Sequence, residues 1–340
     1  MSYLLYKLRF PNGIHIGTAS GNTLEETMMS VYSDTFYSAI YNEYMKIYND
    51  DELYKISETG EFLISDLLPF KEKEDISTDF YLPKPFISVQ RDETIKEKND
   101  EEVIDRKKVK ATNFIPADKL GEYFSFLKTG KNFPEIDDDF GKKELYTKNK
   151  VSLKNEDTKL YNIEVFKFNE KSGLYFIVRL PENNEWQEIF ENILESLSLT
   201  GIGGKRNSGF GQFTSEDPMF FDGEDFDAIE SESDAYINRA LYSDEKNFLS
   251  ISSYSPKMKE IEKIKESENY YQLIKRSGFV NSSLYSEQAE KRKQVYMLSS
   301  GSVLSFKPEG KILDLKLHGK HSIYRMGKPI ILGVKIWAIY

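Results

Sequence analysis

The sequence of 340 residues contains no cysteine. This absence excludes a disulfide framework, a zinc–thiolate site and a catalytic thiol, and it agrees with a reducing compartment. Histidine is scarce as well, with three in the whole chain. Imidazole chemistry therefore depends on His15, His318 and His321. The last two lie three residues apart without a cysteine or an obvious carboxylate pair beside them, so we expect no metal site there, and nothing in the sequence calls for a cofactor.

Long hydrophobic runs are also missing. No window reaches the about 18 consecutive apolar residues of a membrane-spanning helix, and the longest apolar stretch, Ile330–Tyr340, is interrupted by Gly333 and Lys335. The segment Met1–Phe10 lacks the basic start and apolar core of a secretory signal. We therefore expect a cytoplasmic protein.

Aromatic residues are abundant, because 23 Phe and 22 Tyr contribute to an aromatic fraction of 14%. Each large ring buries much apolar area, so the chain can build a core although hydrophobic residues make up only 39%. The length favours two domains. We expect an N-terminal domain over residues 1–215 and a C-terminal domain over 235–340. Residues 216–234, with nine acids and no base, are expected to form an acidic linker or surface loop.

Charge is divided unevenly between the two halves. Residues 1–234 hold 28 bases and 46 acids, whereas 235–340 hold 18 bases and 10 acids. The overall net charge of −10 argues against a nucleic-acid partner. A polyanion, however, responds to the local basic patch and not to the average. The acidic half could instead meet a basic protein partner.

Periodicity predicts a mixture of strands and helices in the N-terminal half. Their order is strand, helix, strands, helix, strand, which is typical of an α+β, ferredoxin-like βαββαβ unit with insertions, the plan also of RNA-recognition domains. The two later strands are joined by residues 169–173 in a hairpin-like connection. The main predicted elements are strand Leu4–Phe10, a helix from Ser33, strands Tyr161–Phe168 and Leu174–Leu180, and helix Trp186–Leu197 ending at Gly201.

One charged segment does not fit this pattern. Residues Gln90–Lys110 contain seven acids and seven bases with little apolar periodicity. The segment forms either a solvated loop or a hairpin that projects into a groove. We expect it to belong to an insertion that spans about residues 80–115.

The most informative local motif is the glycine-rich segment Gly201–Gly211, with five glycines in 11 residues. Glycines let the backbone approach a ligand closely, and the N–H groups of such a loop can bind an anion. The segment differs from a nucleotide-binding P-loop, because Leu199 replaces the first glycine and the loop follows a helix. We favour RNA-backbone binding over a purely structural turn. The predicted RNA contacts are Gly201, Gly203, Gly204, Lys205, Arg206, Asn207, Ser208, Gly209, Phe210 and Gly211.

This segment resembles the glycine-rich loop of the RAMP superfamily of CRISPR proteins. Further segments resemble landmarks of one subgroup, the fourth subunit of the type III-A (Csm) effector complex, and together they cover nearly the whole chain. They are Ser33–Ala39, Ile64–Pro69, Leu82–Pro85, Lys275–Val280 and His321–Pro329.

The resemblance implies a non-catalytic subunit with two RNA-recognition-like domains that acts in antiviral defence. Such a subunit holds the 5′ repeat-derived tag of the guide RNA (crRNA). It contacts the large polymerase-like subunit and the first copy of the repeating backbone subunit. The resemblance also implies a β-hairpin thumb that kinks the guide–target duplex, and we expect it within residues 80–115.

Other residues are candidates for RNA contact. Lys7 and Arg9 share one strand face, and Tyr81 and Phe86 could stack on bases. Two alternatives stay open: a metal-independent endoribonuclease that uses His15 with Lys205 or Arg206, and the equivalent cap subunit of a type III-B complex. The candidates outside the glycine-rich segment are Lys7, Arg9, His15, Ser33, Arg276, His321 and Arg325.

Overall fold

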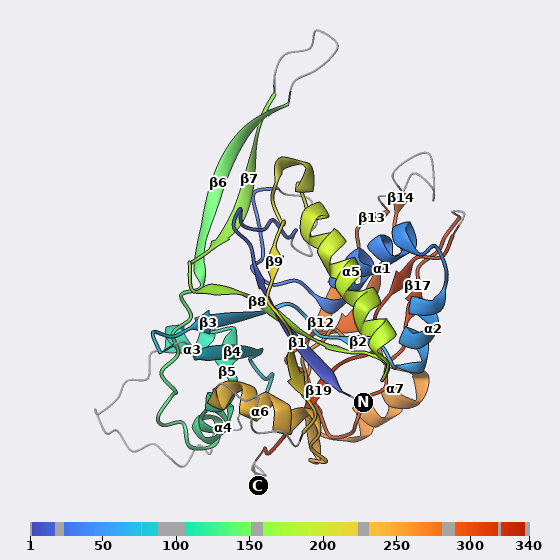
Figure 1. Ribbon diagram of the computed structural model, residues 1–340. Coiled ribbons are helices and arrows are strands. Elements are labelled where there is room, and N and C mark those ends of the chain that lie inside the picture. The colour runs from blue at the N-terminus through green and yellow to red at the C-terminus, as the bar shows by residue number, and fades with distance from the viewer. Residues whose placement is uncertain are drawn as a thin grey trace.

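The computed structural model describes residues 2–17, 24–75, 77–87, 106–150, 159–223, 231–280, 290–318 and 321–336 (Figure 1). Residues 88–105, which include most of the charged segment Gln90–Lys110, lie outside them. Within the described residues, no helix is both long enough and apolar enough to cross a membrane. The fold is α+β, with antiparallel strand pairs throughout.

A large antiparallel sheet organises the N-terminal half. Its strand order is β10-β1-β8-β3-β4-β5. In addition, β2 pairs with β8, and β9 pairs with β1. The segment β9/β10, β1, β8, β3 has the order of a ferredoxin-like βαββαβ unit, in which α1 follows β1 and α5 follows β8. The predicted plan of this half is therefore confirmed. The elements are β1 (Tyr3–Arg9), α1 (Ser33–Ile47), α2 (Glu52–Thr59), β2 (Leu63–Ile64), β3 (Leu68–Glu72), β4 (Thr78–Pro83), β5 (Phe114–Pro116), β8 (Ser172–Arg179), α5 (Asn184–Thr200), β9 (Thr214–Ser215) and β10 (Met219–Phe221).

Helix α5 ends at Gly201, as its sequence predicts, and begins two residues before the predicted Trp186. The side chain of Asn183 accepts a hydrogen bond from the backbone N–H of Trp186, which satisfies one unpaired donor at the helix start. The apolar stripe that includes Phe190 and Leu197 is buried. Gly201, at φ 79°, ends the helix in a conformation that residues with a side chain rarely adopt. The glycine-rich segment thus starts at a fixed point.

A long hairpin projects from this half (Figure 1). It consists of β6 (Gly141–Lys150) and β7 (Lys159–Phe168), paired in register over their whole length. The expected hairpin between β7 and the strand after it is wrong, because β8 pairs with β1 and β3 instead. Leu174–Val178 are buried, so β8 needs partners inside the sheet core, whereas residues 141–149 of β6 are all exposed or half-buried. Between β4 and β6 the chain also forms α3 (Arg106–Ala111), which lies within the predicted insertion, and η1 (Ala117–Lys119) and α4 (Leu120–Thr129), which follow it.

The C-terminal half contains shorter strands. Its three-stranded sheet has the order β16-β11-β19, and β12–β15, β13–β14 and β17–β18 form separate pairs. The order β16-β11-β19 does not repeat the four-strand order of the N-terminal sheet. The elements are α6 (Glu232–Leu241), β11 (Asn247–Ser250), α7 (Met258–Glu266), β12 (Leu273–Arg276), β13 (Phe279–Val280), β14 (Glu290–Lys291), β15 (Val295–Leu298), β16 (Val303–Leu304), β17 (Leu313–Asp314), β18 (Tyr324–Arg325) and β19 (Ile331–Val334).

The acidic segment 216–234 is built into the fold where it is described, so it is not simply a linker. Strand β10 pairs with β1, with Tyr3 opposite Phe221. Ser231 and Asp234 form a capping box at the start of α6. One hydrophobic core includes residues of both halves, among them Phe176 and Leu249. The two halves therefore pack against each other through shared apolar contacts.

Candidate nucleic-acid interface

The glycine-rich segment forms a closed loop that lies against the turn after β1. Its two ends meet through the hydrogen bond from Ile202 N to Gly211 O, of 2.8 Å. Gly211 N donates to Gly13 O at 2.9 Å, and Gly204 N donates to His15 O at 2.8 Å. These bonds fix both sides of the loop to the chain between β1 and α1.

Two of the glycines are required by this close packing. Gly211 has φ 78°, and a Cβ built on it would lie 1.9 Å from Ile202 O. Gly203 has φ 90°, and its Cβ would lie 2.5 Å from His15 O. A side chain at either position would meet both a backbone clash and an unfavourable left-handed conformation. The glycine-rich segment therefore has a structural role, which the sequence analysis considered as the alternative to RNA binding.

The tip of the loop is the part that faces solvent. Arg206, Asn207 and Ser208 form the short helix η2 and are exposed. Lys205, at φ 58°, is half-buried, and its Nζ lies 4.6 Å from the ring centroid of Tyr161. Gly209 at the end of η2 also has a left-handed conformation, at φ 82°. The tip thus presents two cations and polar side chains to solvent.

The loop is attached to the projecting hairpin. Phe210 is buried in a small cluster with Ile163 and Val165 of β7. Lys148 of β6 lies over the Phe210 ring, with its Nζ 4.8 Å from the centroid. Phe210 is therefore a packing residue in this structure, whereas the sequence predicted it as an RNA contact. Its burial brings the cations of the loop and of the hairpin to one place.

His15 has a buried position, which corrects its prediction as an RNA contact. Its side chain is only 3% exposed, and its Nδ1 lies 2.7 Å from Glu164 O of β7. A Cβ on Gly204 would lie 2.8 Å from its Cδ2. The imidazole is thus enclosed between the glycine-rich loop and the hairpin and cannot reach a solvent-side phosphate.

Lys7 and Arg9 lie on one face of β1, as predicted, but carboxylates neutralise them. Glu216 accepts from Lys7 at 2.6 Å and from Arg9 Nε at 2.9 Å. Glu72 also forms ion pairs with both cations. Burial alone would raise the pKa of Glu216, but the hydrogen bonds from Lys7 and Arg9 lower it. Free charge for RNA is therefore not available at this pair.

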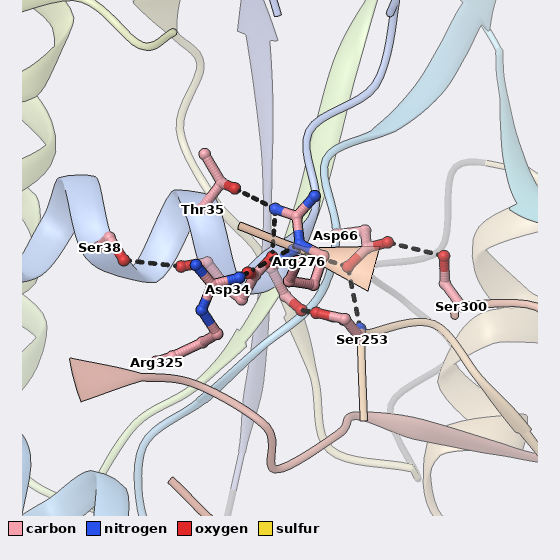
Figure 2. A network of polar contacts seen from close by, with 9 residues as sticks. Asp34, Thr35, Ser38, Asp66, Ser253, Arg276, Ser300 and Arg325 are labelled. Carbon is pink, nitrogen blue, oxygen red and sulfur yellow. Dashed lines mark hydrogen bonds and ion pairs between the residues drawn. The ribbon is translucent and has the colours of Figure 1, made fainter. Parts of the chain in front are cut away.

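A buried ionic network joins the two halves at the start of α1 (Figure 2). Asp34 accepts from Arg276 Nε at 3.0 Å and Nη2 at 2.8 Å, and from Arg325 Nη1 at 2.6 Å. The side chain of Asp34 is 1% exposed. Burial lowers the pKa of Arg325 to about 10. The negative charge of Asp34 raises this pKa, and the nearby positive charges of Arg276 and Arg292 lower it further. Both arginines therefore hold a structural contact between β12, β18 and α1.

A second carboxylate, Asp66, lies beside this network. It accepts from the backbone N–H groups of Ser33 and Ser253 at 2.7 and 3.2 Å, and from Ser300 Oγ at 2.7 Å. Burial raises its pKa to about 6 even though these hydrogen bonds favour the charged form. Ser33 is itself buried, with its hydroxyl bonded to Ser253.

Several predicted contacts therefore have structural partners instead. Ser33, Arg276 and Arg325 belong to the buried network, and the ring of Tyr81 is buried, with its hydroxyl donating to Asp137 O. His321 is exposed, and its Nδ1 lies 2.8 Å from Ser322 O. Among the described residues, no group of three His, Asp or Glu side chains could hold a metal ion.

Comparison with protein families identifies both parts of the chain. The model of the RAMP superfamily matches residues 14–214, and the model described as the CRISPR Csm4 C-terminal domain matches residues 243–334. The protein named "CRISPR system Cms protein Csm4" from Mycobacterium tuberculosis strain H37Rv is 27% identical over 311 residues, which are 92% of each chain. A protein of the same name from Streptococcus thermophilus is 26% identical over 99% of this chain and 100% of that one.

Solved structures share the fold over the full length. A Csm1–Csm4 cassette in complex with cA4 contains a chain with a TM-score of 0.58 and 16% identity, which covers 99% of both chains. A Csm3–Csm4 subcomplex of the type III-A interference complex contains one with a TM-score of 0.56 and 20% identity, covering 98% of this chain and all of that one.

Proposed function

Because the chain belongs to the RAMP superfamily and has the C-terminal domain of Csm4, we propose that it is the subunit that holds the 5′ tag of the crRNA in a type III-A CRISPR complex. The similarity to Csm4 rests on family models that match both halves of the chain and on relatives that match nearly its full length. The Csm4 domain also favours type III-A over the type III-B alternative.

One observation supports the RNA-binding role most directly: unpaired cations meet where the glycine-rich loop joins the hairpin. Among the described residues, no carboxylate forms an ion pair with Lys148, Lys205 or Arg206, in contrast to Lys7 and Arg9. Lys148 and Lys205 are held over the rings of Phe210 and Tyr161, which position their charges without neutralising them. A phosphodiester chain offers the counter-charge that this cluster lacks.

We assign the thumb that kinks the guide–target duplex to β6–β7 instead of residues 80–115. This hairpin extends beyond the body of the molecule in Figure 1. It also carries the exposed apolar side chains Leu145 and Leu160, which are suited to contact unstacked bases. Residues 88–105 stay outside the described residues and are not required for this assignment.

We infer two protein partners from the relatives. The titles of the solved structures pair Csm4 with Csm1 and with Csm3, so this chain should contact a Csm1-type large subunit and a Csm3-type backbone subunit. The excess of acids in residues 1–234 suits basic partner surfaces. The assembled complex would act in the cytoplasm on invading transcripts.

We further propose that the subunit is non-catalytic. The endoribonuclease alternative requires an accessible His15 near Lys205 or Arg206. His15 is enclosed, and its Nδ1 contacts a backbone carbonyl. A general base must come within hydrogen-bond distance of the proton that it removes, and the enclosed ring is not placed for such contact.

The test compares two double variants in the assembled complex. Lys205→Ala with Arg206→Ala removes the cations at the loop tip, and Lys128→Ala with Lys265→Ala removes two exposed cations on α4 and α7. The first variant should weaken crRNA binding and reduce the slope of log affinity against log salt by about 1.4, because single strands lose about 0.7 per phosphate contact. The control should retain the wild-type slope. Equal slopes in all three proteins would contradict RNA binding at this loop.

A further inference from the structure

The outer face of the strands β12–β15 and β13–β14 carries exposed rings. Tyr296 of β15 is 60% exposed, Phe279 of β13 is 55% exposed and Leu273 of β12 is 56% exposed. Tyr271, two residues before Leu273, is exposed as well. Large apolar side chains exposed together on one face differ from the scattered ones of an ordinary surface and indicate an interaction site.

The register places Leu273, Lys275 and Tyr296 on one face of the β12–β15 pair, and Phe279 and Lys291 on one face of the β13–β14 pair. Lys275 lies opposite Tyr296, and Phe279 lies opposite Lys291. Side chains of directly opposed residues in an antiparallel pair project to the same side. Arg276, next to Lys275, projects to the other side and binds Asp34. One face of β12 therefore serves the core, and the other is open to solvent.

Lysines accompany these rings. Lys275 and Lys291, which lie opposite the rings, are exposed, and so is Lys293 in the connection between β14 and β15. In the part of the chain that the structure describes, none of the three forms an ion pair with a carboxylate. The face thus combines aromatic rings with free cations, in a half of the chain that has 18 bases against 10 acids.

The composition of this surface favours single-stranded nucleic acid over a protein partner. Cores of protein–protein interfaces are enriched in aromatic residues but depleted in lysine. Surfaces that bind single-stranded nucleic acid combine rings, on which bases stack, with cations that follow the backbone. Here the ring of Tyr296 lies opposite Lys275, and the ring of Phe279 lies opposite Lys291. Base stacking and phosphate contact can therefore occur side by side.

We propose that this face, defined by Leu273, Lys275, Phe279, Lys291 and Tyr296, is a stacking surface for single-stranded RNA. In Figure 1, β13–β14 lie at the same end of the molecule as the C-terminal end of α5 and the β6–β7 hairpin. RNA held at the glycine-rich loop can therefore continue toward this face. The inference rests on the proposed RNA-binding function and adds a second contact area to it.

The experiment measures binding of the full chain to a short single-stranded RNA that carries 2-aminopurine as a fluorescent base. The variants Tyr296→Ala and Phe279→Ala remove one ring each, and Lys275→Ala with Lys291→Ala removes the opposed cations. The double variant Met258→Ala with Lys265→Ala is the matched control, because it removes an exposed apolar side chain and an exposed lysine on α7.

Each ring variant should bind at least about fivefold more weakly and show less quenching of 2-aminopurine, because one stacking contact is lost. The lysine variant should reduce the salt slope by about 1.4 with quenching retained. The control should match wild type. Since the rings are exposed, folding of the variants should be unaffected, and circular dichroism checks this.

The outcomes separate this proposal from the function on which it rests. If Lys205→Ala with Arg206→Ala weakens binding while the ring and lysine variants leave it unchanged, the stacking surface is wrong and the loop function stands. If the ring variants lose only the contact with the Csm1-type or Csm3-type subunit, the face is a protein interface and the proposal is wrong. If the wild-type chain and the assembled complex bind no RNA, both proposals are overturned.

Discussion

Removal of the Asp34 carboxylate should be among the most destabilising single changes in the chain. Asp34 accepts three charge-assisted hydrogen bonds from Arg276 and Arg325, and all three side chains are largely buried. Asp34→Ala would leave two buried guanidinium groups without their ion-pair partner. Breaking a buried ion pair by removing one partner costs about 3–5 kcal/mol. That amount is a large share of the about 5–15 kcal/mol that stabilises a typical folded domain.

The assay is urea unfolding of the purified chain, followed by circular dichroism. The free energy of unfolding should fall by about 3–5 kcal/mol in Asp34→Ala. Glu52→Gln serves as the control, because Glu52 forms an exposed pair with Lys55, and exposed pairs contribute at most about 1 kcal/mol. A second variant, Asp34→Ala with Arg325→Met, should recover part of the loss, because one uncompensated charge is removed.

Two results would refute this reasoning. A loss below about 1 kcal/mol in Asp34→Ala would mean that solvent or another group compensates the arginines. A double variant that is less stable than Asp34→Ala would mean that Arg325 stabilises the fold through contacts other than its ion pair.

Three further predictions concern other buried groups. Gly211→Val should disrupt the glycine-rich loop and reduce assembly with crRNA more than Lys205→Ala does, and gel filtration of the complex measures this. Normal assembly of the Gly211→Val variant would mean that the loop tolerates a Cβ at 1.9 Å from Ile202 O. The pKa of Asp66 is about 6 in the folded chain against 3.8 as its ordinary value, so the folded state keeps its proton to higher pH. The contribution of Asp66 to stability should therefore fall by about 3 kcal/mol as pH rises from about 4 to 7. Asp66→Asn should remove that pH dependence, and an unchanged pH profile would contradict the assignment. His15→Ala should leave crRNA length unchanged on a sequencing gel, since the ring is enclosed, and longer crRNA in the variant complex would revive the endoribonuclease alternative.

Local patterns predicted the elements whose burial follows a regular period. The apolar stripe of α5, its end at Gly201 and the start of the sheet at β1 follow from sequence alone, because helix and strand periodicities are short-range signals. The hairpin of β6 and β7 was missed as a unit. Residues 141–149 are mostly polar and are exposed or half-buried, so the apolar alternation that marks a half-buried strand is absent.

The candidate site depended on contacts between distant residues, which sequence patterns do not reveal. Lys7 and Arg9 were correctly placed on one face, but Glu216 neutralises them from more than 200 residues away. In the segment Lys275–Val280, Arg276 was chosen as the RNA contact. In the structure, Lys275 and Phe279 are the exposed residues, and Arg276 binds Asp34. A shift of one residue along a strand exchanges its two faces.

The central claim is that the 5′ tag of the crRNA lies against the glycine-rich loop, and photo-crosslinking tests it most directly. The assembled complex would be formed with crRNA carrying 4-thiouridine at single positions, irradiated, and digested for mass spectrometry. Crosslinks from tag positions should map to peptides that contain Lys205–Ser208 and Lys148, and they should disappear in Lys205→Ala with Arg206→Ala. Tag crosslinks confined to other subunits, with none on this chain, would contradict the account.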